Sequence, residues 1–349
     1  MNRVLDFRSD TVTRPTPAMR EAMFRAEVGD DVYGEDPTVN ALEQAAADRL
    51  GFEAALYGVS GTQTNLLGLM AHCQRGEEVI VGQMAHTYRW EAGGMAVLGS
   101  IQPQPLENNA DGTIDVERIE AAIKPDDSHC AVTRLVALEN TFGGRVLPQD
   151  YVQRVRRLAD RHGLAMHLDG ARLFNAAVAC AEQGTLTAAE AARQIAAPFD
   201  SVSICLSKGL GAPVGSLLLG SRPLIERARR LRKMIGGGMR QAGVVAAAGL
   251  YALDHHIERL ATDHANAQRL AQGLQQAGAG QLDIEPAQTN MVWISVAEPV
   301  AARFAAHLAA NGVLVQGTNR QRWVTHLDLE ATDVDAALEV VRAFFCGNP

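Results

Sequence analysis

Three short segments combine reactive side chains with glycine, and each lies beside an apolar run. In the first, Asp169 ends a β-rich run and precedes a glycine. In the second, Lys208 stands between a serine and a glycine-rich turn. In the third, Ser60, Gly61 and Thr62 precede a stretch with helical spacing. Each segment also has an ordinary structural explanation, which is a turn, a solvated lysine or a helix N-cap.

Each segment offers a different chemistry. A carboxylate at a strand tip, such as Asp169, can pair with a cationic ring nitrogen, and Arg172 could face the same ligand. An apolar, glycine-rich setting favours the neutral amine, so Lys208 could attack a carbonyl and form a Schiff base. The free N–H groups at the start of the helix after residues 60–62 form an anion site. A phosphate cradle, a pyridinium partner and a Schiff-base lysine are together what pyridoxal phosphate (PLP) requires of a protein.

Other catalytic motifs are not matched. The segment 58–61 lacks the GxSxG pattern of a nucleophile elbow, and the glycines from Gly209 to Gly215 lack the GxGxxG spacing of nicotinamide-binding loops. His255, His256 and His264 have neither the spacing nor the cysteine partners of a zinc site. We therefore expect no metal site and expect these histidines to lie on the surface.

The runs that must position these residues alternate between strand and helix. This alternation predicts an α/β fold with a mostly parallel sheet flanked by helices. Ligands of such sheets bind at the carboxyl ends of the strands, and the spacing from Asp169 to Lys208 leaves room for one helix and a return strand. Both residues are therefore expected on neighbouring strand tips. The expected strands are 78–82, 135–138, 164–168 and 201–206, and the expected helices are 62–73 and 149–162.

The C-terminal part shows a different order of elements. A long helical region at 241–277 precedes an alternation that suits a smaller α+β domain, and Thr332 is expected to cap the final helix. We therefore expect a large domain at 1–245, including the N-terminal segment, and a small domain at 246–349. Its expected strands are 291–294, 313–315 and 322–325, and its expected helices are 300–311 and 332–345.

The composition restricts the class of protein. The chain has 349 residues, of which 47% are hydrophobic and 21% charged, so it can form a core and is not disordered. A formal net charge of −8 argues against a nucleic-acid partner. No apolar run reaches the roughly 18 residues that span a bilayer. Five cysteines without a CxxC pair, and an N-terminus unlike a signal peptide, predict reduced thiols in the cytoplasm.

Several blocks of the sequence resemble the low-specificity L-threonine aldolase family of PLP enzymes. The resemblance extends from Arg8 to about His326, which is nearly the whole chain. Several matching blocks in the right order make a chance similarity improbable. The blocks are FRSDTVTRP (7–15), GDDVYGEDP (29–37), SGTQTN (60–65), AHTYR (85–89), LDGAR (168–172), SKGLG (207–211) and GGGMRQ (236–241).

The resemblance implies a fold and a set of cofactor contacts. The fold is the aspartate-aminotransferase-like type I architecture, with a smaller C-terminal domain, in a homotetramer whose subunits share active sites. Lys208 would bind the cofactor covalently, Asp169 would pair with the pyridine nitrogen, and His86 would stack on the ring. The phosphate would be held by Ser60, Gly61 and Thr62, with help from Arg240 and Lys233, which a neighbouring subunit could supply.

The resemblance also implies a substrate site for a β-hydroxy-α-amino acid. Ser9, Arg172 and Arg322 would grip the substrate carboxylate or a cofactor oxygen, and Tyr33 and Tyr88 would line the site. An arginine fork on the carboxylate would set the Cα–Cβ bond perpendicular to the cofactor ring. The expected reaction is retro-aldol cleavage of L-threonine or L-allo-threonine to glycine and an aldehyde.

The base that removes the β-hydroxyl proton is the open point of this mechanism. His86 is a candidate, directly or through a water, although a stacked histidine is not ideally aimed. The family often has a second histidine in an E-N-T-H segment, where this chain has Phe142 after Glu139, Asn140 and Thr141. Phe142 cannot relay a proton, and we expect it to make the pocket for the β-substituent more apolar.

Three other functions compete with this one. An aminotransferase or a β-eliminating lyase would keep the cofactor and break a different bond. A ligand-sensing domain of a transcription regulator would need a basic DNA-binding extension, which is not seen before the block that starts at Phe7. A nucleotide-binding α/β enzyme would use no PLP and would give a colourless protein.

Overall fold

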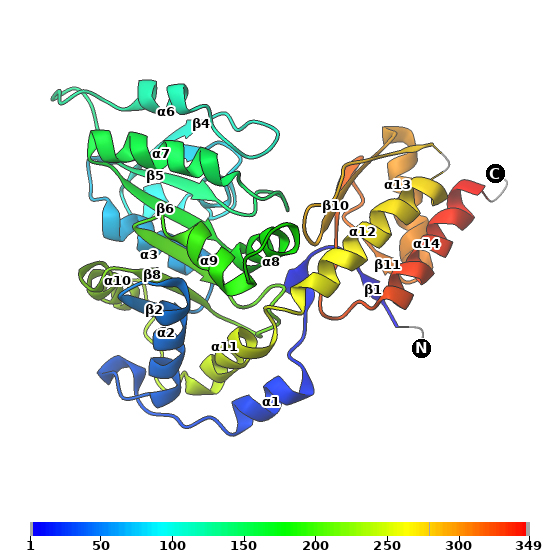
Figure 1. The fold of residues 1–349 in the computed structure, drawn as a ribbon, viewed down its shortest axis with the longest axis horizontal. Coiled ribbons are helices and arrows are strands. Elements are labelled where there is room, and N and C mark those ends of the chain that lie inside the picture. The colour runs from blue at the N-terminus through cyan, green and yellow to red at the C-terminus, as the bar shows by residue number, and fades with distance from the viewer. Residues whose placement is uncertain (1–2, 279, 347–349) are drawn as a thin grey trace.

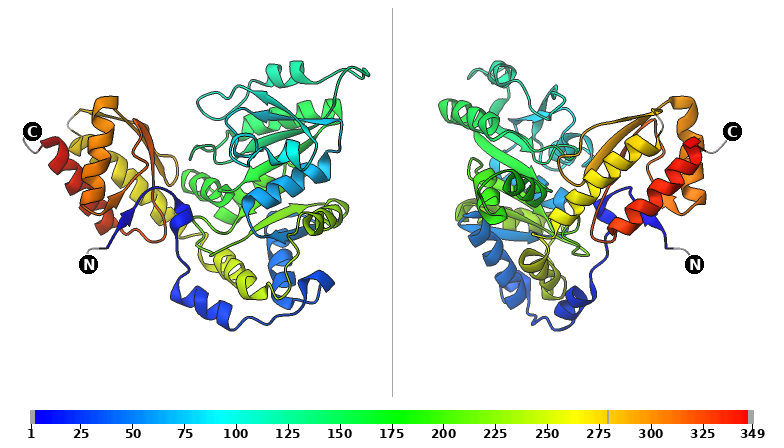
Figure 2. Two further views of the ribbon diagram at one scale, coloured as in Figure 1. Left: turned by 180° about the vertical axis from the view of Figure 1, so that it is seen from behind. Right: turned by 45° about the vertical axis from the view of Figure 1, so that its right-hand side comes forward.

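The computed structural model describes residues 3–278 and 280–346 of the chain. Figure 1 shows a larger body on the left, built around a sheet, and a smaller body on the right that holds the last helices. The views in Figure 2 place the first strand, β1 (Leu5–Asp6), beside the smaller body. The chain therefore passes from the smaller body to the larger one and returns through the long helix α12 (Leu260–Ala277).

A seven-stranded sheet organises the larger body. Strand β8 is antiparallel to both of its neighbours, and the remaining strands share one direction, so the expected mostly parallel sheet is confirmed. The carboxyl ends of the parallel strands consequently meet at one edge. In spatial order the strands are β2 (Ala54–Gly58), β8 (Ser216–Gly220), β7 (Ser201–Cys205), β6 (Ala165–Gly170), β5 (Val132–Glu139), β3 (Glu77–Gly82) and β4 (Gln102–Leu106).

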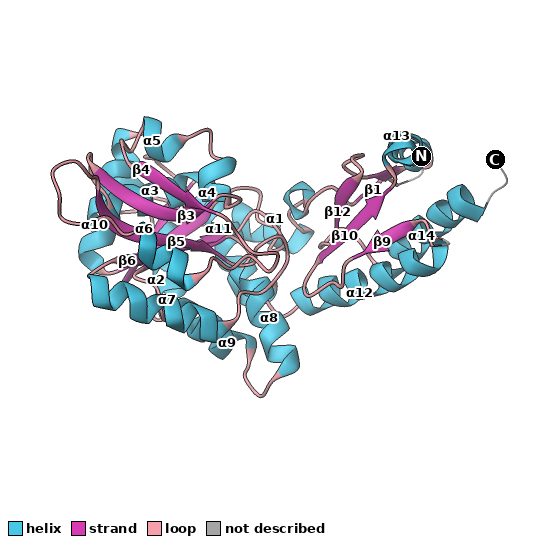
Figure 3. Ribbon diagram, turned by 90° about the horizontal axis from the view of Figure 1, so that it is seen from above, coloured by secondary structure: helices cyan, strands magenta, loops and turns pink. Residues whose placement is uncertain are grey.

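Helices cover both faces of this sheet, as Figure 3 shows from above. Successive side chains of a strand point to opposite faces. On β5, Val136 and Leu138 join the largest apolar core, whereas Leu135 and Ala137 join a second core on the other face. The first face packs against α2 (Pro37–Leu50), α7 (Gln149–His162), α8 (Leu173–Gln183), α9 (Ala188–Ala196) and α11 (Gly243–His255), and the second packs against α3 (Gly61–His72) and α10 (Arg222–Met234).

The smaller body contains an antiparallel sheet of three strands, in the order β12 (Arg320–Val324), β10 (Met291–Val296) and β9 (Leu282–Ile284). Helices α12, α13 (Glu298–Ala310) and α14 (Ala331–Cys346) pack with it around one core. The expected strand near residue 313 forms as β11 (Val313–Leu314). It pairs in parallel with β1 rather than joining the sheet, because the N-terminal strand lies beside it.

Short helices interrupt the connecting segments. They are η1 (Asp10–Val12), α1 (Pro17–Phe24), η2 (Asp31–Tyr33), α4 (His86–Arg89), α5 (Gly94–Val97) and α6 (Val116–Ala122). Among the helices of the described residues, none has both the length and the apolar character that a membrane crossing requires.

One helical expectation for the C-terminal part is confirmed and one was wrong. The helical region expected at 241–277 forms as two helices, because α11 packs in the core of the larger body and α12 in that of the smaller one. Helix α14 begins at Ala331, so Thr332 lies in its first turn and is not its cap. The residue before the helix is Glu330, whose backbone N donates to Asp333 Oδ2 in the first turn at 2.9 Å.

The two apolar cores indicate the position of the boundary between the domains. The large core extends through α11 to Leu260, and the small core begins at Ala267. Leu5 and Phe7 also belong to the small core. A division at residue 245 remains a proposal, and the packing favours a boundary near Leu260 with the N-terminal strand in the smaller body.

Candidate active site

Asp169 and Lys208 follow neighbouring strands at the same edge of the sheet. Strands β6 and β7 are parallel, and Asp169 pairs with Ser203 in the register between them. Lys208 comes three residues after Cys205, which ends β7. Helices α8 and α9 connect the two strands, where the sequence predicted one helix. The predicted juxtaposition of a carboxylate and a lysine is thus found at the carboxyl edge.

The Asp169 carboxylate is buried and accepts two protein hydrogen bonds. Ala171 N donates to Oδ1 at 3.1 Å, and Asn65 Nδ2 donates to Oδ2 at 3.0 Å. These two donors fix the position of the carboxylate. Asp169 can therefore pair with a cationic group that approaches the edge.

The loop that carries Lys208 is fastened at two backbone carbonyls. Thr13 Oγ1 donates to the carbonyl of Lys208 at 2.9 Å, and His256 Nδ1 lies 2.7 Å from the carbonyl of Leu210. The Lys208 side chain is half-buried, and within residues 3–278 and 280–346 no carboxylate forms an ion pair with its amine. The backbone is fixed while the amine stays free to react.

Ser60, Gly61 and Thr62 form the start of α3, directly after β2. Ser60 is the N-cap and its Oγ accepts from Gln63 N at 3.2 Å. The buried Ser216 Oγ has no hydrogen-bond partner among the described residues, and a Cβ at Gly61 would lie 3.7 Å from it. Free N–H groups beside an unpaired hydroxyl are suited to hold a phosphate.

His86 begins α4 and lies between two carboxylates. Its Nδ1 is 2.9 Å from Glu91 Oε1, and its backbone N donates to Glu139 Oε2 at 2.8 Å. The hydrogen bond to Glu91 raises the pKa of the His86 imidazole. Burial raises the pKa of Glu91, and burial together with the charge of Asp169 raises the pKa of Glu139 to about 7. Glu139 can therefore exchange a proton near neutral pH, beside a histidine whose pKa is raised.

The raised pKa of Glu139 predicts a pH dependence of stability. The folded protein binds this proton up to about pH 7 and the unfolded chain only up to about pH 4.5, so stability falls as the pH rises between these values. We expect the cofactor-free Glu139→Gln protein to lose about 1–3 kcal/mol less than the wild type between pH 5 and pH 8. Urea unfolding at both pH values measures this difference. Equal losses in the two proteins would contradict the burial of an ionisable Glu139.

The buried carboxylate of Asp10 pairs with one arginine of the site and lies near a second. Arg172 contacts Asp10 through Nε at 2.8 Å and through Nη2 at 2.5 Å. Burial alone would raise the pKa of Asp10, but the Arg172 guanidinium holds that pKa well below its usual range. Arg322 lies nearby on β12, and its buried Nε has no partner among the described residues. Burial, followed by the charge of Arg172, lowers the pKa of Arg322. An unpaired guanidinium of this kind is suited to bind an anion.

The other residues expected to contact the substrate are Ser9, Tyr88 and Tyr33, and they differ in how near they lie to the strand tips. Ser9 caps η1, and its Oγ is 3.5 Å from Asp10 Oδ1, so it belongs to the arginine cluster. Tyr88 lies on α4 two residues after His86 and is 37% exposed. Tyr33 ends η2 and is 76% exposed, and no contact within the described residues brings it to the strand tips.

Lys233 and Arg240 flank a glycine loop that lies on the first turn of α3. A Cβ at Gly237 would lie 2.2 Å from Gln63 Nε2. Arg240 is 57% exposed and its Nη1 contacts Asp30 Oδ2 at 2.9 Å. The charged groups of Lys233 and Arg240 are not found in contact with residues 60–62 in the described single chain, so their phosphate role remains a proposal.

Phe142 stands three residues beyond Glu139 in a tight loop. Its backbone exchanges two hydrogen bonds of 2.9 Å with Arg145, and its side chain lies against Gly112. The ring is half-buried. No hydrogen bond of the described residues joins it to His86 or Lys208, so its place in the pocket for the β-substituent stays a prediction.

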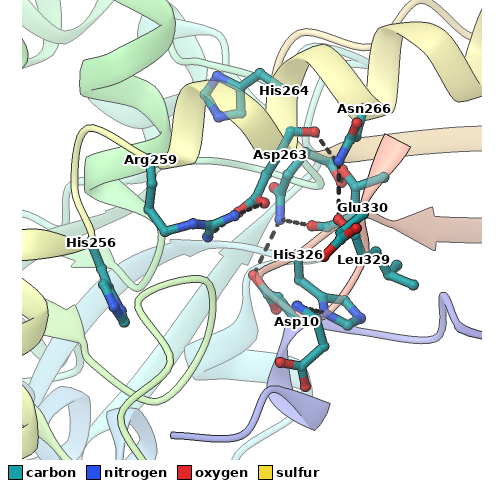
Figure 4. Close-up of polar contacts among 12 residues, drawn as sticks. Asp10, His256, Arg259, Asp263, His264, Asn266, His326, Leu329 and Glu330 are labelled. Atoms are coloured by element: carbon teal, nitrogen blue, oxygen red, sulfur yellow. Dashed lines mark hydrogen bonds and ion pairs between the residues drawn. The ribbon is translucent and has the colours of Figure 1, made fainter. Parts of the chain in front are cut away.

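The expectation for the three C-terminal histidines was wrong in two cases. His255 is exposed, but His256 and His264 are buried. Figure 4 shows them beside the ion pair of Arg259 with Asp263 at the start of α12. His264 lies on α12 where this helix crosses from one body to the other, and it contacts Asn175 of α8. His256 is the C-cap of α11 and faces the carbonyl of Leu210.

Comparison with known proteins supports the family that the motifs indicate. A family model described as "Beta-eliminating lyase" matches residues 6–298. A low specificity L-threonine aldolase of Escherichia coli (strain K12) is 51% identical over 341 residues, which are 98% of this chain and 99% of that protein. The chain belongs to the low-specificity L-threonine aldolase family.

Solved structures extend the likeness to the fold of this aldolase family. The threonine aldolase of Leishmania major matches with a TM-score of 0.82 and 23% identity, over 98% of this chain and 99% of that chain. A structure of SPT with PLP matches with a TM-score of 0.73 and 20% identity, over 97% and 87% of the two chains. The expected PLP fold type I architecture is confirmed.

Four polar residues of the aldolase site were not given a role from the sequence. Glu139 could have been found, because it ends a β-rich run as Asp169 does. Asn65 and Asp10 lie inside the matching family blocks, but nothing in the spacing indicates their partners. Glu91 follows His86 by five residues, and only the turn of α4 brings the two together.

Proposed function

We propose that this chain is a PLP-dependent low-specificity L-threonine aldolase. It would cleave L-threonine, L-allo-threonine and other β-hydroxy-α-amino acids to glycine and an aldehyde. The observation that carries the proposal is the pair formed by Lys208 and the buried Asp169 at one edge of the sheet. The full-length similarity to named aldolases favours this reaction over an aminotransferase or a β-eliminating lyase.

The polar groups of the site fit PLP. Asp169 offers a carboxylate for a ring nitrogen, and the unpaired Ser216 hydroxyl lies beside the anion site at the start of α3. Lys208 would bind the cofactor through its amine, and Ser60, Gly61 and Thr62 would hold the phosphate. When bound, PLP would accept the electrons of the broken Cα–Cβ bond into its ring.

The arginine cluster would hold the carboxylate of the amino-acid substrate. Asp10 fixes one edge of Arg172 through two hydrogen bonds, which leaves the remaining N–H groups for a ligand. Arg322 and Ser9 lie at the same cluster. Two oriented donors on one carboxylate fix rotation of the substrate, which an aldol cleavage requires.

His86 would take the proton of the β-hydroxyl group, directly or through a water. Glu91 accepts from Nδ1, so Nε2 is the ring atom that remains as a base. The same hydrogen bond raises the pKa of His86, which strengthens it as a base. Glu91 would therefore orient the ring and Nε2 would move the proton.

A change at Phe142 should alter the preference of the aldolase among substrates. A histidine there would add a polar group where the wild type has an aromatic ring, so the advantage of a bulky substrate should shrink. We expect Phe142→His to lower the rate on phenylserine relative to L-threonine by about 10-fold, because loss of one apolar contact with the substrate has an effect of this size. Rates on phenylserine and on both threonine isomers measure the effect. An unchanged substrate ranking together with an unchanged threo/erythro ratio would contradict a role of Phe142 in the pocket for the β-substituent.

We also propose that the aldolase is a homotetramer with shared active sites, in which Lys233, Arg240 and Tyr33 act across a subunit boundary. Their exposure in the single chain supports this arrangement. Its partners would be small amino acids, and we expect neither nucleic acid nor a membrane. A cytoplasmic location remains a prediction. Sedimentation of the purified protein tests the tetramer.

Release of aldehyde tests the proposed reaction. L-threonine and L-allo-threonine are incubated separately with the protein and PLP, and the protein stripped of cofactor is the control. We expect acetaldehyde from at least one isomer and none in the control. A cofactor-loaded protein that releases no aldehyde from these substrates or from phenylserine would overturn the proposal. Loss of the amino group in the presence of a ketoacid would instead favour an aminotransferase.

A further inference from the structure

A band of polar side chains is buried between α3 and the centre of the large sheet. His167 and Asp169 on β6 and Ser201 on β7 belong to the face that α3 covers. Helix α3 contributes Asn65 near its start and His72 at its end. These residues connect the strand tip to the far end of α3, and the mechanism uses only Asp169.

The side chains of this band form a continuous series of hydrogen bonds. Asn65 Nδ2 lies 3.0 Å from Asp169 Oδ2, and Asn65 Oδ1 lies 3.3 Å from His167 Nε2. His167 Nδ1 lies 2.8 Å from Ser201 Oγ, which lies 2.8 Å from His72 Nε2. Every link is within hydrogen-bond distance.

Helix α3 is adapted to the imidazole of His167. A Cβ at Gly68 would lie 2.7 Å from His167 Cε1, so a larger side chain would collide with the ring. Glycine is unfavourable in the interior of a helix. A glycine opposite His167 therefore makes room for this ring although it lowers the stability of the helix.

Two carboxylates decide the orientation of the Asn65 amide. Its nitrogen lies 2.9 Å from Glu91 Oε1 as well as 3.0 Å from Asp169 Oδ2. An amide oxygen in that place would face two acceptors, so the NH₂ group must point to the carboxylates. The amide oxygen then faces His167 Nε2 and requires a donor there.

The same logic fixes the remaining links. His167 must carry its proton on Nε2, so its Nδ1 accepts from Ser201, and the Ser201 oxygen accepts from His72 Nε2. Burial lowers the pKa of His167 to about 3 and that of His72 to about 4, so both rings are neutral at physiological pH. All donors in the series point toward the carboxylate of Asp169. Hydrogen bonds aligned in this way strengthen one another.

We propose that His167 is a positioning residue for Asp169, acting through Asn65 as the central link of a one-way series of hydrogen bonds that begins at His72. The inference rests on the proposed PLP enzyme, because it assigns Asp169 to the ring nitrogen. His167 keeps the Asn65 amide turned so that the Asp169 carboxylate keeps its hydrogen bond from Asn65 and stays aimed at that nitrogen. It touches neither cofactor nor substrate.

Cofactor binding by matched variants tests this role. PLP is titrated into cofactor-free wild type, His167→Leu and His167→Gln, and the affinity and the visible absorbance of the bound cofactor are recorded. We expect His167→Leu to weaken PLP binding by about 10- to 100-fold and to change the absorbance, because Asn65 Oδ1 loses its donor. Glutamine can donate to Asn65 and should restore both properties to within a few-fold.

His264→Gln is the control for general damage to the fold. His264 is also buried, its pKa is also lowered by burial, to about 4, and it bonds Asn175 outside the series. It should lower stability without changing the absorbance of bound PLP. If His167→Leu does not fold, Ser201→Ala replaces it, and a smaller change in the same direction is expected.

The tautomer of His167 gives a second readout that needs no activity. In ¹⁵N-histidine-labelled holoenzyme, we expect nuclear magnetic resonance to show His167 and His72 neutral with the proton on Nε2. A proton on His167 Nδ1, or unchanged PLP affinity and absorbance in His167→Leu, would overturn the inference. Failure of the proposed function looks different, because a wild type that binds PLP but releases no aldehyde leaves these readouts intact.

Discussion

Replacement of Lys208 by alanine is expected to lower aldehyde release from both threonine isomers by at least about 1,000-fold. The lysine amine is the group that would bind PLP covalently, and its neighbours are arranged to leave it free. Its backbone is fastened by Thr13 and its amine has no carboxylate partner among the described residues. Alanine removes the nucleophile and keeps the loop, so the protein should fold and still bind PLP without a covalent bond.

The small number of lysines makes this prediction sharp. The sequence contains Lys124, Lys208 and Lys233. After reduction of the loaded protein with borohydride, mass spectrometry should place the cofactor on Lys208 in the wild type and find none in Lys208→Ala. Lys124→Ala is the matched control, because Lys124 pairs at 3.5 Å with Glu78 of β3, the strand next to the edge strand β4. A cofactor adduct on Lys124 or Lys233, or an active Lys208→Ala protein, would refute the assignment.

The central part of the site could be predicted because local patterns and the sheet rule agree. A β-rich run that ends in Asp169, and another that precedes Lys208, place both residues at the carboxyl edge once the sheet is parallel. Ser60 likewise caps α3 as its type and position indicate. Such features depend on a few consecutive residues and on one topological rule.

The edge strands could not be predicted in the same way. Strand β4 has the sequence QPQPL, and proline is tolerated there because the strand has a neighbour on one side only. Strand β2 at the opposite edge and its neighbour β8 consist mainly of alanine, leucine and glycine, which do not indicate a strand by themselves. Their burial between helix layers stabilises them, and this depends on contacts distant in the sequence.

The polar partners inside the site depend on the tertiary structure in the same way. Asp10 meets Arg172 across 162 positions of sequence, and Asn65 meets Asp169 across 104. His264 lies on a helix whose pattern is polar, yet the junction of the two bodies buries it. Spacing along the chain identifies residues that could react, whereas only the fold shows which groups orient them.

Replacement of Arg322 by leucine is expected to weaken catalysis and to strengthen the fold. The guanidinium would supply charge-assisted hydrogen bonds to the substrate carboxylate, so KM for L-threonine should rise by about 100-fold, with a smaller change in kcat. In the free protein the same group is costly. Its Nε is buried without a partner among the described residues, and the like charge of Arg172 is close.

Removal of this half-buried charge, whose buried Nε has no partner among the described residues, therefore should raise the free energy of unfolding of the cofactor-free protein by about 1–2 kcal/mol. Arg320→Leu is the matched control on the same strand, since Arg320 is exposed, contacts Glu285 and stacks on Trp293. It should lose a little stability and keep KM. Steady-state kinetics and urea unfolding of the two variants separate the effects. If Arg322 merely supported β12, its substitution would lower the stability of the protein. A destabilised Arg322→Leu protein with unchanged KM would therefore show that the substrate carboxylate is bound elsewhere.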